Sequence, residues 1–133
     1  MRHTLRLHGV IVGHSDLERV DVEARRASGA FRPGLGYDLV QPVFRLYSRA
    51  VALDGTTRDA ELLERYHGAR DALQLELQDA DGHAIPASTI HISDYRDEDA
   101  SALPQLDVLI ADDEYWRRRL NEGRWVASGT AKD

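Results

Sequence analysis

Residues 38–53, DLVQPVFRLYSRAVAL, carry the clearest periodicity of the chain and decide its fold class. Apolar side chains recur along this stretch with the one-sided spacing of an amphipathic helix, and arginine and serine occupy the other face. Asp38 can accept hydrogen bonds from first-turn amides, and Pro42 falls where a missing amide hydrogen costs least. We expect a helix from about Asp38 to Leu53, with a stripe of Leu39, Val40, Val43, Phe44, Leu46, Tyr47, Ala50 and Val51.

A second helix is predicted directly after Asp54-Gly55, which ends the first. Thr56 and Asp59 stand three residues apart, as in a capping box, and Gly68 offers a point of close helix approach. Because the link between the helices is short, they should lie antiparallel. The second stripe consists of Leu62, Leu63, Tyr66, Ala69, Ala72 and Leu73.

Alternating polar and apolar residues predict strands before these helices. Residues 4–13 predict a hairpin that turns at His8-Gly9, where glycine supplies the positive φ of a two-residue turn. Residues 19–24 predict a third strand, which can continue with a bend into residues 28–31.

Strand patterns also follow the helices. Residues 75–78 and 89–93 predict a second hairpin that turns at residues 79–82, and residues 106–110 predict a buried strand. Residues 112–119 predict a short helix with acids in its first turn and arginines in its last.

This order of elements indicates an α+β domain rather than alternating βαβ units. We expect one domain over residues 1–133, with a mostly antiparallel sheet of about five to six strands. A two-helix layer should cover one face of the sheet, and a short C-terminal helix should precede a frayed tail at about residues 127–133.

Composition excludes several classes of protein. A hydrophobic share of 42% and a charged share of 30% argue against disorder, and no apolar run approaches the length of a membrane span. Without cysteine the chain has no disulfide or thiolate site, so we expect a cytoplasmic protein. Residues 1–70 hold 11 basic against 9 acidic residues, whereas residues 71–133 hold 6 against 14. The acidic second half favours solubility or a basic partner over nucleic acid.

Motifs for metal, nucleotide or nucleic-acid binding are weak. Residues 79–82, DADG, resemble the start of a calcium loop, but Ile90 stands where its late acidic ligand belongs, so a hairpin turn is the better interpretation. No two histidines have the spacing that places both on one helix face, and no phosphate-binding glycine loop occurs. Arginines 117–119 follow three acids, which indicates a charge-balanced helix end. We expect no metal, no cofactor and no nucleic-acid partner.

Acidic and aromatic residues are densest after residue 93, and they form the most specific candidate site. If the loop and the following strand share one surface, they offer an acidic patch edged by aromatic anchors for a basic protein. The alternative is a solvated acidic surface without a partner. The predicted partner-binding residues are Asp94, Tyr95, Asp97, Glu98, Asp99, Asp112, Asp113, Glu114, Tyr115 and Trp116.

The favoured function is therefore a non-enzymatic protein-binding module, in its narrowest form an immunity-like or antitoxin-like inhibitor of a basic partner. One alternative is a small hydrolase or ligand-binding enzyme that uses His91 with Asp94, or His14 with Asp16. Exposed strand residues and a turn after a strand explain the same two pairs without chemistry. A second alternative is an assembly or scaffold subunit, which an exposed apolar patch would favour.

Residues 29–33 (GAFRP), Tyr37 and residues 42–46 (PVFRL) form a pattern that is similar to small uncharacterised bacterial proteins. The resemblance covers about residues 5–50 and implies a bacterial origin. No activity accompanies it, so it assigns no functional residue.

Overall fold

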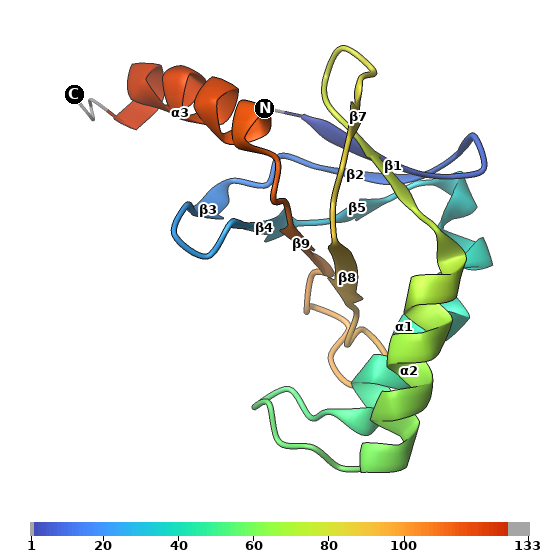
Figure 1. Ribbon diagram of the computed structural model, residues 1–133. Helices are drawn as coiled ribbons and strands as arrows, with labels where there is room; N and C mark the ends of the chain where they lie inside the picture. Colours follow the sequence, from blue (N-terminus) through green and yellow to red (C-terminus); the bar gives the residue numbers. More distant parts are fainter. Residues whose placement is uncertain (1, 128–133) are drawn as a thin grey trace.

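Antiparallel strand pairing builds two sheets, with helices α1 and α2 on one flank and α3 on another (Figure 1). The computed structural model describes residues 2–127. The first sheet has the order β5-β2-β1-β6-β7, and its strands are β1 (His3–Leu7), β2 (Val10–Ser15), β5 (Arg32–Pro33), β6 (Glu76–Gln78) and β7 (Ala84–Ile85). The second has the order β3-β4-β9-β8, with β3 (Arg19–Asp21), β4 (Arg26–Ala30), β8 (Thr89–Ser93) and β9 (Gln105–Leu109).

The helices are the 3-10 helix η1 (Leu35–Leu39), α1 (Gln41–Ala50), α2 (Ala60–Leu73) and α3 (Asp113–Ala127). The predicted α+β class, the antiparallel pairing and the C-terminal helix are confirmed. Of the frayed tail predicted at about residues 127–133, Ala127 is the last residue of α3, and residues 128–133 lie outside the described residues. Between residues 2 and 127, no helix combines the length and the apolar character needed to cross a membrane.

The first predicted hairpin is confirmed. Leu7 pairs with Val10, and the two turn residues, His8 and Gly9, have φ values of 48° and 85°. Two consecutive positive φ angles are those of a tight type I′ turn, whose twist matches that of the strands.

Two strand partners differ from the prediction. Residues 19–31 form a separate hairpin of β3 and β4 instead of one bent strand, because the chain turns at Arg25, whose φ is 56°. Strand β6 pairs with the short β7, whereas β8 leaves that sheet and pairs with β9. The alternation of each strand was visible in the sequence, but the choice of partner depends on contacts distant along the chain.

The first predicted helix begins later than expected. Asp38 lies within η1 and does not cap α1, whose N-cap is Val40. Pro42 explains the break, because it lacks the amide hydrogen that a helix begun at Asp38 would use, whereas it is tolerated in the first turn of α1, which begins at Gln41.

The second predicted helix is confirmed, but it begins at Ala60 rather than near Thr56, because Asp59 is its N-cap. The Asp59 carboxylate accepts a hydrogen bond of 3.0 Å from the backbone N–H of Leu62. The side chain of Tyr66 is buried on the inner face of α2. Gly68 is exposed and has no neighbouring atom within 4 Å of a Cβ position, so it does not mark a close helix approach.

Candidate functional site

The aromatic residues predicted to edge an acidic patch lie in the core. Tyr95, Tyr115 and Trp116 are buried, and their polar atoms bond within the chain. The Tyr95 hydroxyl donates to the carbonyl oxygen of Val51 at 2.8 Å, and the Trp116 indole N–H donates to that of Ile110 at 2.6 Å. These three side chains therefore give a surface partner no anchor.

Asp94 is also buried, in a fully bonded network. Its carboxylate accepts a hydrogen bond of 2.8 Å from the Tyr37 hydroxyl and two from the Arg96 guanidinium, at 2.9 and 2.7 Å. Burial acts to raise the pKa of Asp94, but the bonds from Arg96 and Tyr37 outweigh it and lower the pKa to about 2. Asp94 has a structural partner set and is not a free surface charge.

The remaining acids form two groups instead of one patch. The loop of residues 94–101 lies beside α1 and α2, whereas residues 112–114 lie at the start of α3 (Figure 1). Most of these carboxylates pair with arginines of the same chain, which reduces the charge that they offer to a partner. The pairs are Asp97–Arg45, Glu98–Arg58, Asp113–Arg25 and Glu114–Arg117. Asp99 instead bonds to Ser101, and Asp112 accepts from the Glu114 amide.

The pair of His14 and Asp16 does not form. Nδ1 of His14 lies 3.1 Å from the Thr4 hydroxyl, and the Asp16 carboxylate lies 3.4 Å from the Arg32 guanidinium. Burial and the nearby arginines lower the pKa of His14. His14, in β2, and Asp16, just after it, are therefore bonded to separate partners.

His91 is separated from Asp94. It belongs instead to a row of hydrogen-bonded side chains, together with Tyr66 and Ser93. Its Nδ1 shares a short hydrogen bond with the Tyr66 hydroxyl, and its Nε2 lies 2.9 Å from Oγ of Ser93. The Tyr47 ring contacts the imidazole, with ring centroids 4.3 Å apart. Strand alternation predicted an exposed histidine, whereas helices α1 and α2 cover this face. The sequence signal for this covered face was the presence of Tyr47 and Tyr66 in the two predicted apolar stripes of the helices.

Burial lowers the pKa of His91 to about 4, so the imidazole is neutral at pH 7 and has one donor and one acceptor nitrogen. The Arg70 guanidinium lies 5.4 Å from the centre of the Tyr66 ring. Burial raises the pKa of Tyr66, so its hydroxyl keeps its proton, and in the His91 tautomer that accepts this proton at Nδ1 the imidazole donates from Nε2. Nε2 then donates to Ser93, whose own hydrogen remains available.

One end of this chain of hydrogen bonds, Ser93, lines a hollow, whereas the other end, Tyr66, is fully buried and lines neither of the two hollows that follow. The loop hollow, of about 270 Å³, lies where residues 102–105 meet the end of α1, and Tyr47, Leu53, Ser93, Tyr95, Leu103 and Gln105 are among its lining residues. The helix-end hollow, of about 190 Å³, lies between the end of α2 and β8. Its lining includes Arg70, Asp71, Gln74, Leu75, Thr89 and Ile90.

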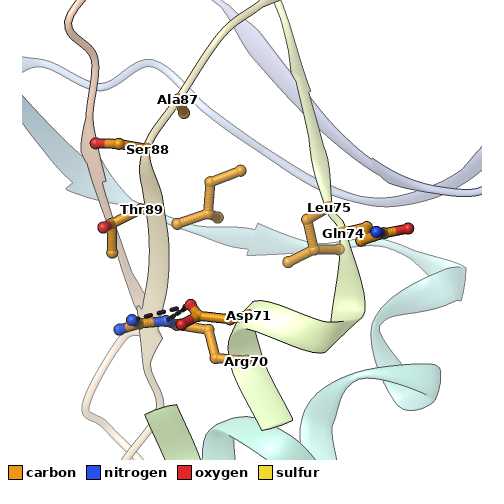
Figure 2. A pocket seen from close by; sticks show the side chains of 8 residues that line it. Arg70, Asp71, Gln74, Leu75, Ala87, Ser88 and Thr89 are labelled. Carbon is orange, nitrogen blue, oxygen red and sulfur yellow. Dashed lines mark hydrogen bonds and ion pairs between the residues drawn. The ribbon is translucent and has the colours of Figure 1, made fainter. Parts of the chain in front are cut away.

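Figure 2 shows the helix-end hollow with the ion pair of Arg70 and Asp71 at one end. The Nη2 atom of Arg70 lies 3.1 Å from the Asp71 carboxylate, so this cation is already paired. Leu75 and the backbone of residues 87–89 flank the space. The helix-end hollow therefore offers less to a ligand than the loop hollow does.

The β6–β7 turn is a hairpin turn, as predicted. Asp79 is buried, and its carboxylate accepts hydrogen bonds of 2.9 Å from the amides of Asp81 and His83. Ligand atoms of these three residues lie within 4.8 Å of one another, close enough to hold a metal ion. The Arg118 guanidinium also lies 3.5 Å from Asp79 and competes for the same carboxylate.

An exposed apolar surface lies elsewhere, where η1 meets β2. We define the apolar surface as Val10, Ile11, Leu35 and Leu39, whose exposed fractions are 44%, 37%, 102% and 61%. Leu35 stands between Gly34 and Gly36, which both lie close to the Ile11 backbone. Leu39 was expected in a buried helix stripe, and its exposure follows from the shift of that segment into η1.

Comparison with known proteins assigns no family, because no family model, no curated protein and no solved structure gives a significant match.

Proposed function

We propose that this protein acts by binding another protein through the apolar surface of Val10, Ile11, Leu35 and Leu39. The observation that carries the proposal is the complete exposure of Leu35 on η1, which also exposes Leu39 and packs on β2, where Val10 and Ile11 are exposed. Single exposed apolar residues are common, whereas a group of them on one surface is typical of an interaction site.

The backbone around Leu35 supports this proposal because it is held in place. A Cβ atom at Gly36 would lie 2.5 Å from the carbonyl oxygen of Ile11, so η1 packs directly on β2. Tyr37, two residues beyond Leu35, is buried and bonded to Asp94. A rigid exposed leucine loses little backbone entropy on binding, which favours affinity.

A basic partner, and with it an inhibitor of a basic toxin, stays a narrower proposal. The net charge of −6 favours it, and internal ion pairs reduce the charge that is available. Near the apolar surface, Asp38 and Arg49 are exposed and line one hollow, so both signs of charge are present. The geometry favours a protein partner without selecting a basic one. A cytoplasmic location likewise stays a prediction from composition.

The test is binding to the products of neighbouring genes by the wild-type chain and matched variants. We expect one such product to co-purify, and the double variant Leu35→Asp/Leu39→Asp to bind it more weakly by roughly tenfold or more, as measured by calorimetry. The control is Val20→Asp/Leu120→Asp, which places the same charges on exposed apolar residues outside both the apolar surface and the loop hollow. A partner bound equally by both double variants contradicts the proposal, as does co-purification of none.

A further variant, with four substitutions, tests the basic partner. Reversal of Asp97, Glu98, Asp112 and Asp113 to lysine should reduce the association rate at low salt if charge steers the encounter. An affinity unchanged by the four reversals would reject the basic partner and leave the apolar surface as the binding determinant.

A further inference from the structure

The loop hollow combines apolar walls with a polar group that the core holds in position. Leu53 and Leu103 lie at its exposed rim, with exposed fractions of 58% and 70%, and Tyr47 and Tyr95 form part of its walls. Ser93 lies in the same lining and is opposite Gln105 across β8 and β9. Apolar walls with few polar groups are the usual composition of a small-molecule site.

Ser93 has an oriented hydroxyl. Its Oγ lies 2.9 Å from Nε2 of His91, and in the described part of the chain this is the only hydrogen bond of its side chain. With Nε2 as donor, the Ser93 hydrogen is left for an acceptor outside the chain. Gln105 is less available, because its side-chain oxygen accepts from Arg19 at 2.6 Å.

Charge and size restrict the ligand. None of the nine lining residues, all within the described part of the chain, is charged, so an ion entering the hollow would lose water without gaining a counter-charge. A volume of about 270 Å³ exceeds the roughly 150 Å³ that holds one benzene molecule. One ring with a short substituent therefore fits.

We propose that the loop hollow is a binding site for a small neutral molecule that has one apolar ring or branched aliphatic body and one hydrogen-bond acceptor, such as a carbonyl oxygen, for Ser93. Leu53 and Leu103 hold the apolar body. His91 is a positioning residue, because it fixes the serine hydroxyl without touching the ligand. This site is separate from the apolar surface, so the two proposals can fail independently.

The probes are acetophenone, which has a ring and a carbonyl, ethylbenzene, which lacks the acceptor, and benzoate, which is charged. Titrations followed by amide chemical shifts should show saturable changes at residues 52–55, 93, 102, 103 and 105. For acetophenone we expect a Kd on the order of millimolar, as for other ligands of about nine non-hydrogen atoms. Ethylbenzene should bind roughly tenfold more weakly, and benzoate should cause no saturable shift there.

Two variants separate the contributions. Ser93→Ala should remove the preference for acetophenone over ethylbenzene while ethylbenzene still binds, and Leu103→Asp should abolish binding of both. Ser88→Ala is the matched control, because Ser88 precedes the same strand but lies outside the loop hollow. Thermal unfolding of each variant confirms that it folds.

Three results would overturn the proposal. They are the absence of saturable shifts up to the solubility limit, shifts confined to another surface, and an unchanged preference for acetophenone in a folded Ser93→Ala variant. Loss of protein binding in Leu35→Asp/Leu39→Asp would leave this site unaffected.

Discussion

Burial of the His91 imidazole makes the stability of the protein depend on pH. The pKa of His91 falls from the ordinary 6.5 to about 4 in the folded state, because burial disfavours the charged form. The unfolded chain therefore binds a proton that the folded chain rejects between these two values. We expect stability to be complete above pH 6.5, to fall by about 3 kcal/mol as the pH drops to 4, and to change little further through this group.

Urea denaturation of wild type and His91→Gln at pH 7.5 and pH 5 measures this dependence. The variant should be less stable at pH 7.5 and should lose less stability between the two values. His8→Asn is the control, because His8 is exposed in a turn whose φ of 48° asparagine tolerates. An equal pH dependence in wild type and His91→Gln would contradict the assignment to His91.

Tyr37 and Tyr95 are buried tyrosines whose hydroxyls donate to different acceptors. Tyr37 donates to the ionised Asp94 carboxylate, and Tyr95 donates to the neutral carbonyl of Val51, both at 2.8 Å. Bonds to charged groups contribute about 1.5–3 kcal/mol, and neutral bonds about 1 kcal/mol. In urea denaturation at pH 7, Tyr37→Phe should therefore lower the free energy of unfolding more than Tyr95→Phe does.

Measurement at low pH gives a second test of the stability difference between Tyr37→Phe and Tyr95→Phe. Because the pKa of Asp94 is lowered to about 2, its stabilising effect is present above the ordinary value of 3.8 and is lost as the pH falls through about 2. The difference between the two tyrosine variants should shrink over the same range. A difference that persists at pH 1.5, or a larger effect of Tyr95→Phe at pH 7, would contradict the charged role of Asp94.

At the scale of elements, substitution of two glycines separates the effect of close packing from the effect of helix propensity. A Cβ atom on Gly36 would meet the Ile11 carbonyl oxygen at 2.5 Å, whereas one on Gly68 would meet no atom within 4 Å. Gly36→Ala should therefore lower the free energy of unfolding by about 1–3 kcal/mol. Gly68→Ala should raise it by up to about 1 kcal/mol, since alanine favours an exposed helix position. Urea denaturation checks both, and a stable Gly36→Ala variant would mean that η1 can move away from β2.

The same scale shows how far local sequence determines the elements. Helix α2 and the first hairpin follow from signals within a few residues, namely the Asp59 cap and the His8-Gly9 turn. The division of residues 35–50 into η1 and α1 depends on a single proline, Pro42, whereas the sequence pattern predicted one continuous helix. The pairing of β8 with β9 instead of β6 is a choice between sheets, which alternation alone does not encode.

At the scale of the whole molecule, the candidate site was less predictable than the fold. The sequence places acids and aromatics side by side, but Tyr115 and Trp116 on α3 turn into the core and leave the acids outside. Pairing of Asp97 and Glu98 with Arg45 and Arg58 joins segments about 40 to 50 residues apart. Such pairs become visible only once the tertiary structure is known, and they change a predicted patch of negative charge into a largely balanced surface.

The hydrogen bonds among Tyr66, His91 and Ser93 have a consequence for the molecule as a whole. With neutral His91, the three side chains carry three polar hydrogens and share two hydrogen bonds, so one hydrogen is left over. With Nε2 of His91 as the donor, Ser93 carries this hydrogen in the loop hollow; with Nδ1 as the donor, Tyr66 carries it in the core beside Arg70. A molecule that takes the hydrogen of Ser93 therefore favours the form in which Tyr66 donates to His91. The loop hollow and the core beneath α2 are thus linked by the allocation of a single proton, without any movement of the backbone.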